Sequence, residues 1–290
     1  MTGFWDSALR QLVPTKVKGL IKRSGLYLRH RSAYANVYHC CVHKTASGWI
    51  KLMLSDSRTY RWSGLSAHNY RRELPGRHDA RKITDRAFAQ PFPRETIVTS
   101  LFIDFENFMA VPKPERWRAF FVMRDPRDLV VSWYFSMRYS HPLIGSLPGI
   151  RKRLQKMSLG DGLLYTVERL RDQGHFSALR SWAELSSKEE NTLLVKFEDL
   201  TGPDKLDLFG DLFSFCDIGM PGHVLRHLLE DYSFERLADR KRGEEDRHSH
   251  YRKGVAGDWR NYFTDPIAAR FKSVTGDLVV HLGYEKDVDW

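Results

Sequence analysis

A basic, glycine-punctuated segment near the C-terminus carries the clearest chemical signal in this chain. It spans residues 251–264 and contains Arg252 and Lys253, followed by Gly254 and, three residues further on, Gly257. Fixed positive charge beside backbone N–H groups that no side chain shields suits the oxygens of a phosphate group. The segment is therefore predicted to bind a phosphate or a similar anion.

A second segment with phosphate-binding character lies nearer the N-terminus. The apolar run 37–42 is predicted to be a strand, residues 49–54 have a helical pattern, and the loop between them contains one cation, Lys44. A strand, a short loop of small residues and a helix direct unpaired amides at a bound phosphate. The loop lacks the G-x-x-x-x-G-K-[ST] spacing, so an ordinary ATP or GTP site is not expected.

A third candidate lies where the predicted strand 118–123 meets a helix. Asp125 is expected to cap this helix, with Pro126 at its first position. Arg124 and Ser132 stand eight residues apart, and at roughly 1.5 Å per residue Ser132 lies about 9 Å along the helix from Pro126. An anion bound by both would lie beside the helix rather than at its tip. The charged pair that begins the helix is expected to be solvated: Arg127 and Asp128.

The rest of the chain must position these segments, and its pattern predicts an α/β fold. Its 290 residues and 42% hydrophobic content suffice for one large core. From residue 35 onward, apolar runs alternate with helical patterns and no internal repeat is present. We predict one domain over residues 35–290, built on a central, mainly parallel sheet flanked by helices, after a basic amphipathic segment at residues 1–34.

Composition narrows the class of protein. The balance of 46 basic against 36 acidic residues gives a net charge of +10, which favours anionic ligands. Three cysteines cannot form a disulfide framework, and the pair Cys40-Cys41 is predicted to lie in a buried strand. Because no apolar run has the length of a membrane span and no signal-peptide core is present, a soluble, cytoplasmic protein is expected. Residues 1–31 could lie on an anionic membrane surface or pack on the domain as a helix.

These segments resemble, in order, the motifs of sulfotransferases that use 3′-phosphoadenosine 5′-phosphosulfate (PAPS). Residues 43–49 are similar to the family's Pro-Lys-Ser-Gly-Thr-Thr-Trp loop, although His43, Ala46 and Gly48 depart from it. Residues 124–134 are similar to its 3′-phosphate motif, and the C-terminal segment to its Arg-Lys-Gly-x-x-Gly-Asp-Trp motif. Residues 192–200 and 232–234 resemble the segments that border the adenine. The resemblance covers residues 36–264 and implies a P-loop-like sulfotransferase fold with these nucleotide-binding residues: Lys44, Thr45, Ala46, Ser47, Gly48, Trp49, Arg124, Ser132, Phe197, Ser233, Phe234, Arg252, Lys253 and Gly254.

The resemblance also implies the reaction, transfer of a sulfuryl group from PAPS to a hydroxyl or amine without a metal. Lys44 is the expected catalytic residue, because it can neutralise the charge that grows on the departing phosphate. The histidine that many cytosolic members use as general base is absent, since Ser100 stands at or next to its position. A carboxylate at Asp104 or at Glu106 on the same segment could take this role, as could His68, and the leading candidates are Asp104 and His68. The alternative for both is a helix-capping or surface role.

The acceptor is left open by the sequence: a small molecule, a glycan or a lipid hydroxyl would fit, and nucleic acid is not expected. Residues 56–94 and 138–165 are expected to recognise the acceptor, with five candidate aromatic residues: Tyr60, Trp62, Tyr70, Phe102 and Tyr139. Two other functions are weighed. A non-catalytic nucleotide- or polyanion-binding protein would bind anions with steep salt dependence, and a P-loop kinase would need a Mg²⁺ site that is not evident.

Overall fold

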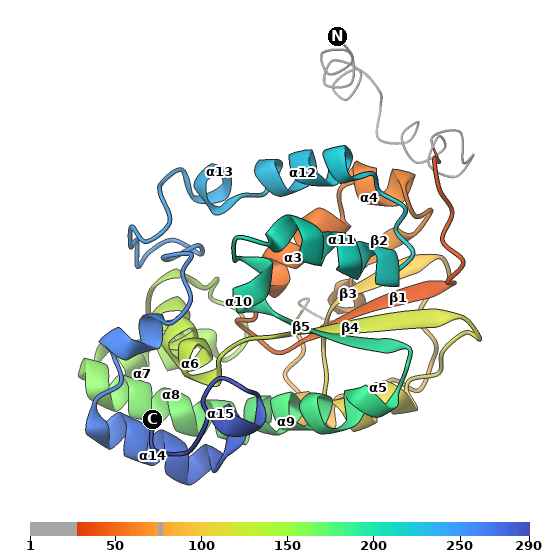
Figure 1. Cartoon of the computed structure of the whole chain (residues 1–290). Helices are drawn as coiled ribbons and strands as arrows, with labels where there is room; N and C mark the ends of the chain where they lie inside the picture. Colours follow the sequence, from red (N-terminus) through yellow and green to blue (C-terminus); the bar gives the residue numbers. More distant parts are fainter. Residues whose placement is uncertain (1–27, 75–77) are drawn as a thin grey trace.

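The computed structural model describes residues 28–74 and 78–290. Within them, five parallel strands form one sheet in the order β2-β3-β1-β4-β5 (Figure 1). The predicted α/β fold with a mainly parallel sheet is confirmed. The strands are β1 (Asn36–Cys41), β2 (Ser66–His68), β3 (Thr96–Phe102), β4 (Trp117–Met123) and β5 (Thr192–Lys196).

Both faces of the sheet are buried, because its strands are apolar on both sides. In β4, Ala119 and Phe121 face one hydrophobic cluster, whereas Phe120 and Val122 face the other. The adjacent cysteines of β1 are fully buried, as the sequence predicted. Alternation along each strand therefore supplies two cores from one sheet.

Helices cover the two faces in two layers (Figure 1). The layer on the first cluster contains α5 (Phe105–Ala110), α6 (Pro126–Phe135), α8 (Leu159–Asp172), α9 (His175–Leu185), α14 (Asp265–Thr275) and α15 (Leu278–His281). The layer on the second contains α3 (Ser47–Leu54), α11 (Lys205–Phe215) and α12 (Gly222–Asp231). The remaining helical elements are α4 (Ser57–Arg61), α7 (Leu147–Gln155), α10 (Phe197–Leu200), α13 (Phe234–Ala238), η1 (Tyr70–Glu73), η3 (Ile83–Asp85), η4 (Ser136–Ser140), η5 (Ser186–Lys188) and η6 (Asp258–Asn261).

Parallel strands end at one edge of the sheet, and this edge gathers the predicted anion-binding segments. The loop of Lys44 follows β1, Arg124 follows β4, and Phe197 follows β5. The chain continues from β1 to β2 on one side of the sheet and later returns to β4 on the other side. In such sheets, ligands bind beyond the carboxyl ends of the strands where the strand order reverses, which here is between β1 and β4.

The N-terminal segment joins the domain before β1. Its Arg29 and Ser32 donate backbone hydrogen bonds of 2.8 Å to the carbonyls of Arg61 and Ser63. The predicted amphipathic stretch at residues 1–31 lies largely outside the described residues. Among the helices that the structure describes, none is both long and apolar enough to cross a bilayer.

Candidate active site

A cavity of about 530 Å³ opens at the carboxyl edge of the sheet. Its wall is formed by the loop after β1, Arg124 and the second half of α6, the α10 segment and the basic C-terminal segment. Among its lining residues are Lys44, Arg124, Ser132 and Arg252. Of the fourteen residues that the sequence resemblance implied for nucleotide binding, all except Thr45 line this cavity. Thr45 is fully buried, and its hydroxyl donates to the Val42 carbonyl at 2.9 Å.

The loop of residues 43–48, called the phosphate loop below, has an unusual backbone. Lys44 and Ala46 have φ values of +73° and +60°, in the left-handed region that favours glycine. Ala46 occupies the N-cap position of α3 without a side-chain cap. The loop therefore turns sharply and leaves the first backbone N–H groups of α3 facing the cavity, where they can donate hydrogen bonds to an anion.

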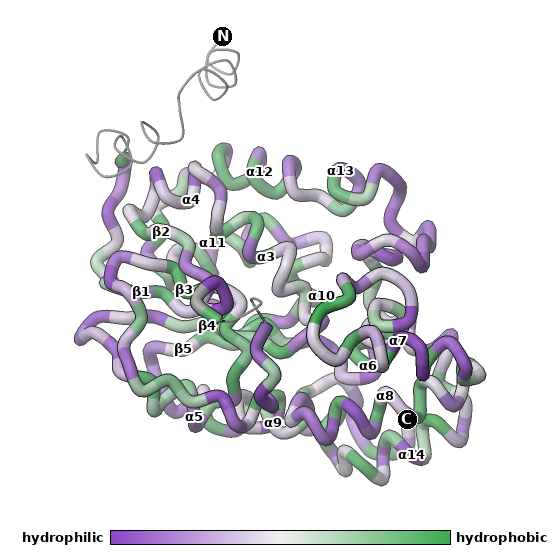
Figure 2. Tube along the Cα trace, turned by 180° about the vertical axis from the view of Figure 1, so that it is seen from behind, coloured by the Kyte–Doolittle hydropathy of each residue, from purple (hydrophilic) through white to green (hydrophobic). Residues whose placement is uncertain are grey.

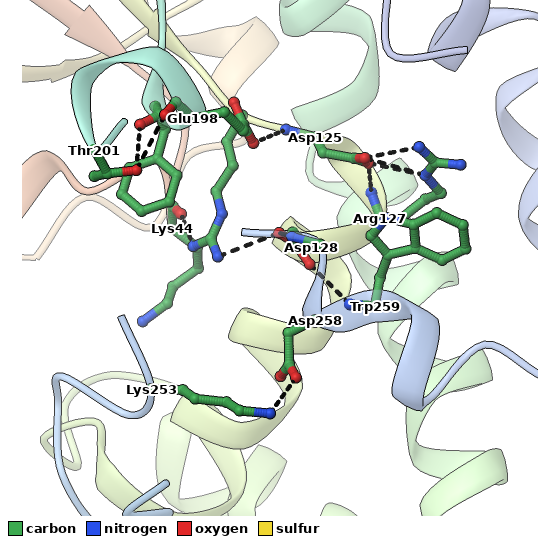
Figure 3. A network of polar contacts seen from close by, with 12 residues as sticks. Lys44, Asp125, Arg127, Asp128, Glu198, Thr201, Lys253, Asp258 and Trp259 are labelled. Atoms are coloured by element: carbon green, nitrogen blue, oxygen red, sulfur yellow. Dashed lines mark hydrogen bonds and ion pairs between the residues drawn. The ribbon is translucent and has the colours of Figure 1, made fainter. Parts of the chain in front are cut away.

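The ammonium group of Lys44 extends into the cavity, away from the carboxylates of the site (Figure 3). No described carboxylate pairs with it. Burial, followed by the nearby charges of Arg124 and Arg252, lowers the pKa of Lys44 to about 7. A bound phosphate would offset these effects, so the site is electrostatically prepared for an anion.

Arg124 is held from three sides beside the phosphate loop. Its guanidinium donates to the Lys44 carbonyl at 3.1 Å and lies 3.7 Å from the Asp128 carboxylate. It also covers the Phe197 ring, 4.5 Å from the ring centroid. Within the segment 192–200, the strand β5 ends at Lys196, and Phe197 begins the short helix α10. Asp125 caps α6 by accepting from the Arg127 amide, as predicted.

The expectation that Arg127 and Asp128 are solvated is wrong, because each side chain is only 1% exposed. Arg127 lies against the ring of Trp259, with ion pairs to Asp125 and Glu285 of 2.8 and 2.7 Å. Asp128 accepts the backbone N–H groups of residues 257 and 259 at 2.7 and 2.9 Å (Figure 3). A helix pattern alone cannot show that a distant segment packs over these two charges.

Residues 251–264, called the C-terminal clamp below, thus lie on the start of α6. In the clamp, Arg252 pairs with the buried carboxylate of Asp258. Lys253 pairs with the same carboxylate at 2.6 Å (Figure 3). Gly254 has a φ of +70°, and a Cβ there would lie 2.4 Å from the Phe234 ring. Glycine is required for this close approach. The clamp therefore presents fixed cations whose charge is already partly balanced.

Neither proposed general base lies on the cavity wall. Asp104 caps α5 by accepting the Asn107 amide at 2.9 Å, and burial raises the pKa of its carboxyl. His68 is in β2, beside the Phe92 ring. Both positions fit the structural roles that the sequence left as alternatives. Three histidines that the sequence reasoning did not favour do line the cavity: His43, His141 and His250.

His43 has the most defined setting of the three. Its ring stacks on Phe102, with centroids 4.1 Å apart and planes at 7°. Its Nδ1 lies 3.1 Å from Nε2 of His175. Burial and the charges around it hold the pKa of His43 well below its usual value, so the imidazole is neutral near pH 7. The clue in the sequence was its place directly before Lys44, at the end of a buried strand.

Of the five aromatic residues proposed for acceptor recognition, only Phe102 lines the cavity. Tyr70 is 3% exposed and belongs to the core, where it packs edge-on against Phe88. The predicted region 138–165 contributes Ser140, His141 and Pro142. Tyr60, Trp62 and Tyr139 are partly exposed, but they lie away from the cavity wall.

Comparison with known proteins identifies the class to which this fold and site belong. The family model described as the sulfotransferase domain matches residues 82–283. This chain therefore belongs to the sulfotransferase domain family. The matched range includes Arg124, Ser132 and the whole C-terminal clamp. The phosphate loop lies before the matched range.

Individual relatives agree with this assignment. Sulfotransferase 2B1 of Mus musculus is 26% identical over 204 residues, which cover 64% of this chain and 54% of the relative. Cytosolic sulfotransferase 17 of Arabidopsis thaliana is 26% identical over 184 residues, covering 57% and 50%. The chain thus spans about half the length of these relatives. The crystal structure of mouse sulfotransferase SULT7A1 complexed with PAP shares the fold, with a TM-score of 0.57, 15% identity and 88% coverage of both chains.

Proposed function

We propose that this protein is a PAPS-dependent sulfotransferase that transfers a sulfuryl group to a hydroxyl or amine acceptor. The observation that carries the proposal is the convergence of Lys44, Arg124, Ser132 and Arg252 on one cavity at the switch point of the sheet. They come from segments far apart in the sequence, and their joint presence suits a ligand with two separate phosphate groups. Membership of the sulfotransferase domain family supports the same assignment.

In this proposal the phosphate loop receives the 5′-phosphosulfate, and Arg124, Ser132 and the clamp receive the 3′-phosphate. Phe197, Ser233 and Phe234 are the proposed neighbours of the adenine. The acceptor oxygen forms a bond to sulfur while the bond between sulfur and the bridging phosphate oxygen breaks. PAP departs with the electron pair of that bond, and the acceptor proton passes to a base. Lys44 would neutralise the charge that develops on the departing phosphate.

For the base, we favour His43 over Asp104 and His68, because it lies on the cavity wall next to Lys44. Contact of Nδ1 with His175 fixes the ring and leaves Nε2 for proton transfer. We expect His43→Gln to lower the rate about 10²–10⁴-fold with PAP affinity retained. His141→Gln, His250→Gln, Asp104→Asn and His68→Gln serve as comparisons, and a larger loss in any of them would transfer the role to that residue.

Calorimetry with PAP and with 5′-AMP tests the proposed nucleotide site. PAP should bind at least tenfold more tightly, because only PAP carries the 3′-phosphate for which Arg124 and Ser132 are proposed. Arg124→Gln should bring the two affinities close together. Equal affinities for PAP and 5′-AMP in the wild-type protein would contradict the proposal.

The two other functions make different predictions for the same experiment. A P-loop kinase would bind ATP with Mg²⁺, whereas the phosphate loop lacks the spacing that such kinases share. A polyanion-binding protein would prefer neither nucleotide, and its affinity would fall steeply with salt. A strong preference for PAP therefore separates a sulfotransferase from both.

We propose a cytoplasmic location for the protein, in line with the name of the Arabidopsis relative. A small-molecule, glycan or lipid acceptor is proposed, without nucleic acid.

Residues 1–34 are proposed as a separate basic segment ahead of a domain over residues 35–290. Removal of the segment before residue 28 tests a membrane role, since binding to vesicles of anionic lipid should be lost while PAP binding is kept.

A further inference from the structure

The cavity has a second side, across β1 from the proposed nucleotide site. In the sheet, β4 and β5 lie on one side of β1, and β3 and β2 lie on the other. Arg124 and Phe197 follow β4 and β5. The opposite wall, called the acceptor side below, is formed by Lys51, Arg71 and Phe102. Lys44, at the end of β1, stands between the two sides.

Arg71 is held on the acceptor side by an aromatic ring. Its guanidinium carbon lies 4.9 Å from the centroid of Phe102, the same ring on which His43 stacks. The backbone N–H of Arg71 donates a hydrogen bond to Oδ1 of Asn69, which caps the short helix η1. The position of the guanidinium thus follows from packing rather than from an ion pair.

Lys51 lies four residues after Ser47 in α3, and therefore on the same face of the helix as Ser47 at the end of the phosphate loop. Burial, followed by the charges of Arg71 and Arg72, lowers the pKa of Lys51. These like charges are thus close enough to repel one another. A side-chain pair of this kind on a cavity wall is unfavourable unless an anion joins it.

No described carboxylate forms a hydrogen bond or ion pair with Lys51 or Arg71. Two arginines that follow in the chain do have a carboxylate nearby: Arg81 pairs with Asp79 at 2.9 Å, and Arg86 lies 3.5 Å from the same carboxylate. Lys51 and Arg71, on the cavity wall, thus differ from Arg81 and Arg86, which lie beside a carboxylate. The phosphates of the proposed donor are met by other cations, so those on the acceptor side are available to another ligand.

We propose that Lys51 and Arg71 bind an anionic group of the acceptor, which is accordingly a hydroxyl compound bearing a carboxylate, phosphate or sulfate rather than a neutral sterol or phenol. The inference rests on the proposed function, because it assigns the other side of the cavity to PAPS. Arginine suits these groups, since its planar guanidinium donates two parallel hydrogen bonds to their oxygens.

The test is a titration of the PAP-saturated protein with three compounds that share one phenolic hydroxyl: 4-hydroxyphenylacetate, its methyl ester, and 4-hydroxyphenylphosphonate. We expect the acid or the phosphonate to bind at least tenfold more tightly than the ester, and the stronger of the two identifies the anion. Equal binding of all three, or binding of none, overturns the inference.

Single variants then locate the effect. Arg71→Gln and Lys51→Gln should each reduce the preference for the anion about tenfold and leave affinity for the ester unchanged. Arg72→Gln is the matched control, because Arg72 is the exposed next residue of η1 and does not line the cavity. An equal loss in Arg72→Gln would mean that only the general positive charge matters, which also overturns the inference. PAP affinity is measured alongside: if the wild-type protein does not bind PAP, the proposed function itself fails.

Discussion

The two proposed phosphate-binding segments line the same cavity, but they differ in whether their cations are paired with a carboxylate. The phosphate loop presents Lys44 without a carboxylate partner, and the pKa of this lysine is lowered to about 7. The C-terminal clamp presents Arg252 and Lys253 already paired with Asp258, and this pairing lowers the pKa of the Asp258 carboxyl. One segment carries uncompensated charge and the other carries balanced charge.

The two segments also differ in backbone strain. Ala46 adopts a left-handed conformation that costs an alanine about 1–2 kcal/mol, whereas the clamp uses glycine for its left-handed turns at residues 254 and 257. Strain and unpaired charge both fall on the loop proposed for the reacting phosphate. The clamp, which is proposed to hold the non-reacting phosphate, is relaxed and paired. This difference indicates that the loop serves the reaction and the clamp serves binding.

Among the variants that test this difference between loop and clamp, Lys44→Ala gives the largest expected effect. If Lys44 acts mainly on the departing phosphate, kcat should fall about 10²–10³-fold, with a much smaller loss of PAP affinity. Turnover is measured by transfer of labelled sulfate from PAPS to any acceptor that the protein accepts. A variant that keeps more than about half of the wild-type rate would remove Lys44 from the mechanism.

In the clamp, Arg252→Gln should act on binding instead. We expect PAP affinity to fall about 10- to 150-fold, because a charge-assisted hydrogen bond to the 3′-phosphate is lost, while 5′-AMP affinity changes little. Calorimetry with both nucleotides measures the difference. Arg260→Gln is the matched control, since Arg260 is exposed in the same segment and does not line the cavity. Parallel losses for PAP and 5′-AMP would contradict the assignment.

The uncompensated charge of the phosphate loop predicts a pH dependence. A bound phosphate favours protonated Lys44, so PAP affinity should be level below the free pKa of about 7 and fall above it, by about fivefold between pH 7 and pH 8. Binding should be accompanied by proton uptake, which is measured as a buffer-dependent heat. Lys44→Arg should abolish the slope, because arginine does not titrate in this range. A slope that persists in Lys44→Arg would assign it to another group.

The smallest effect is expected from Ala46→Gly. Glycine removes the left-handed strain of the phosphate loop but raises the entropy of the unfolded chain, so the net gain in the free energy of unfolding should be about 1 kcal/mol. Urea denaturation measures it. Ala238→Gly, at the end of α13, is the control and should destabilise instead. Destabilisation by Ala46→Gly would show that the loop is not strained in solution.

The anion-binding segments were predictable from the sequence because each is a local pattern. Strand, loop and helix around Lys44 appear in order along the chain, as does the Asp125-Pro126 helix start. Local hydrogen bonding and hydrophobic periodicity determine such units, and parallel strands bring their ends to one edge. Thirteen predicted nucleotide residues consequently line one cavity.

The general base could not be chosen in this way. Asp104 and His68 were selected by their positions relative to motifs, whereas access to the cavity depends on which side chains the packed helices leave uncovered. Asp104 satisfies the first turn of α5, and this local role competes with catalysis. The histidines on the wall come from three distant segments, and only the folded chain brings them together.

The sequence by itself determined the α/β class, the alternation that buries both faces of the sheet, and the cations that favour an anionic nucleotide. These properties depend on residue types and short spacings. The tertiary structure alone decided that Arg127 and Asp128 are buried beneath the clamp, and that Lys51 and Arg71 share a wall without a carboxylate partner among the described residues. In Figure 2 the chain after α13, which leads into the clamp, is largely hydrophilic. Charged residues give no periodic signal of burial, because their burial depends on partners that lie far away in the chain.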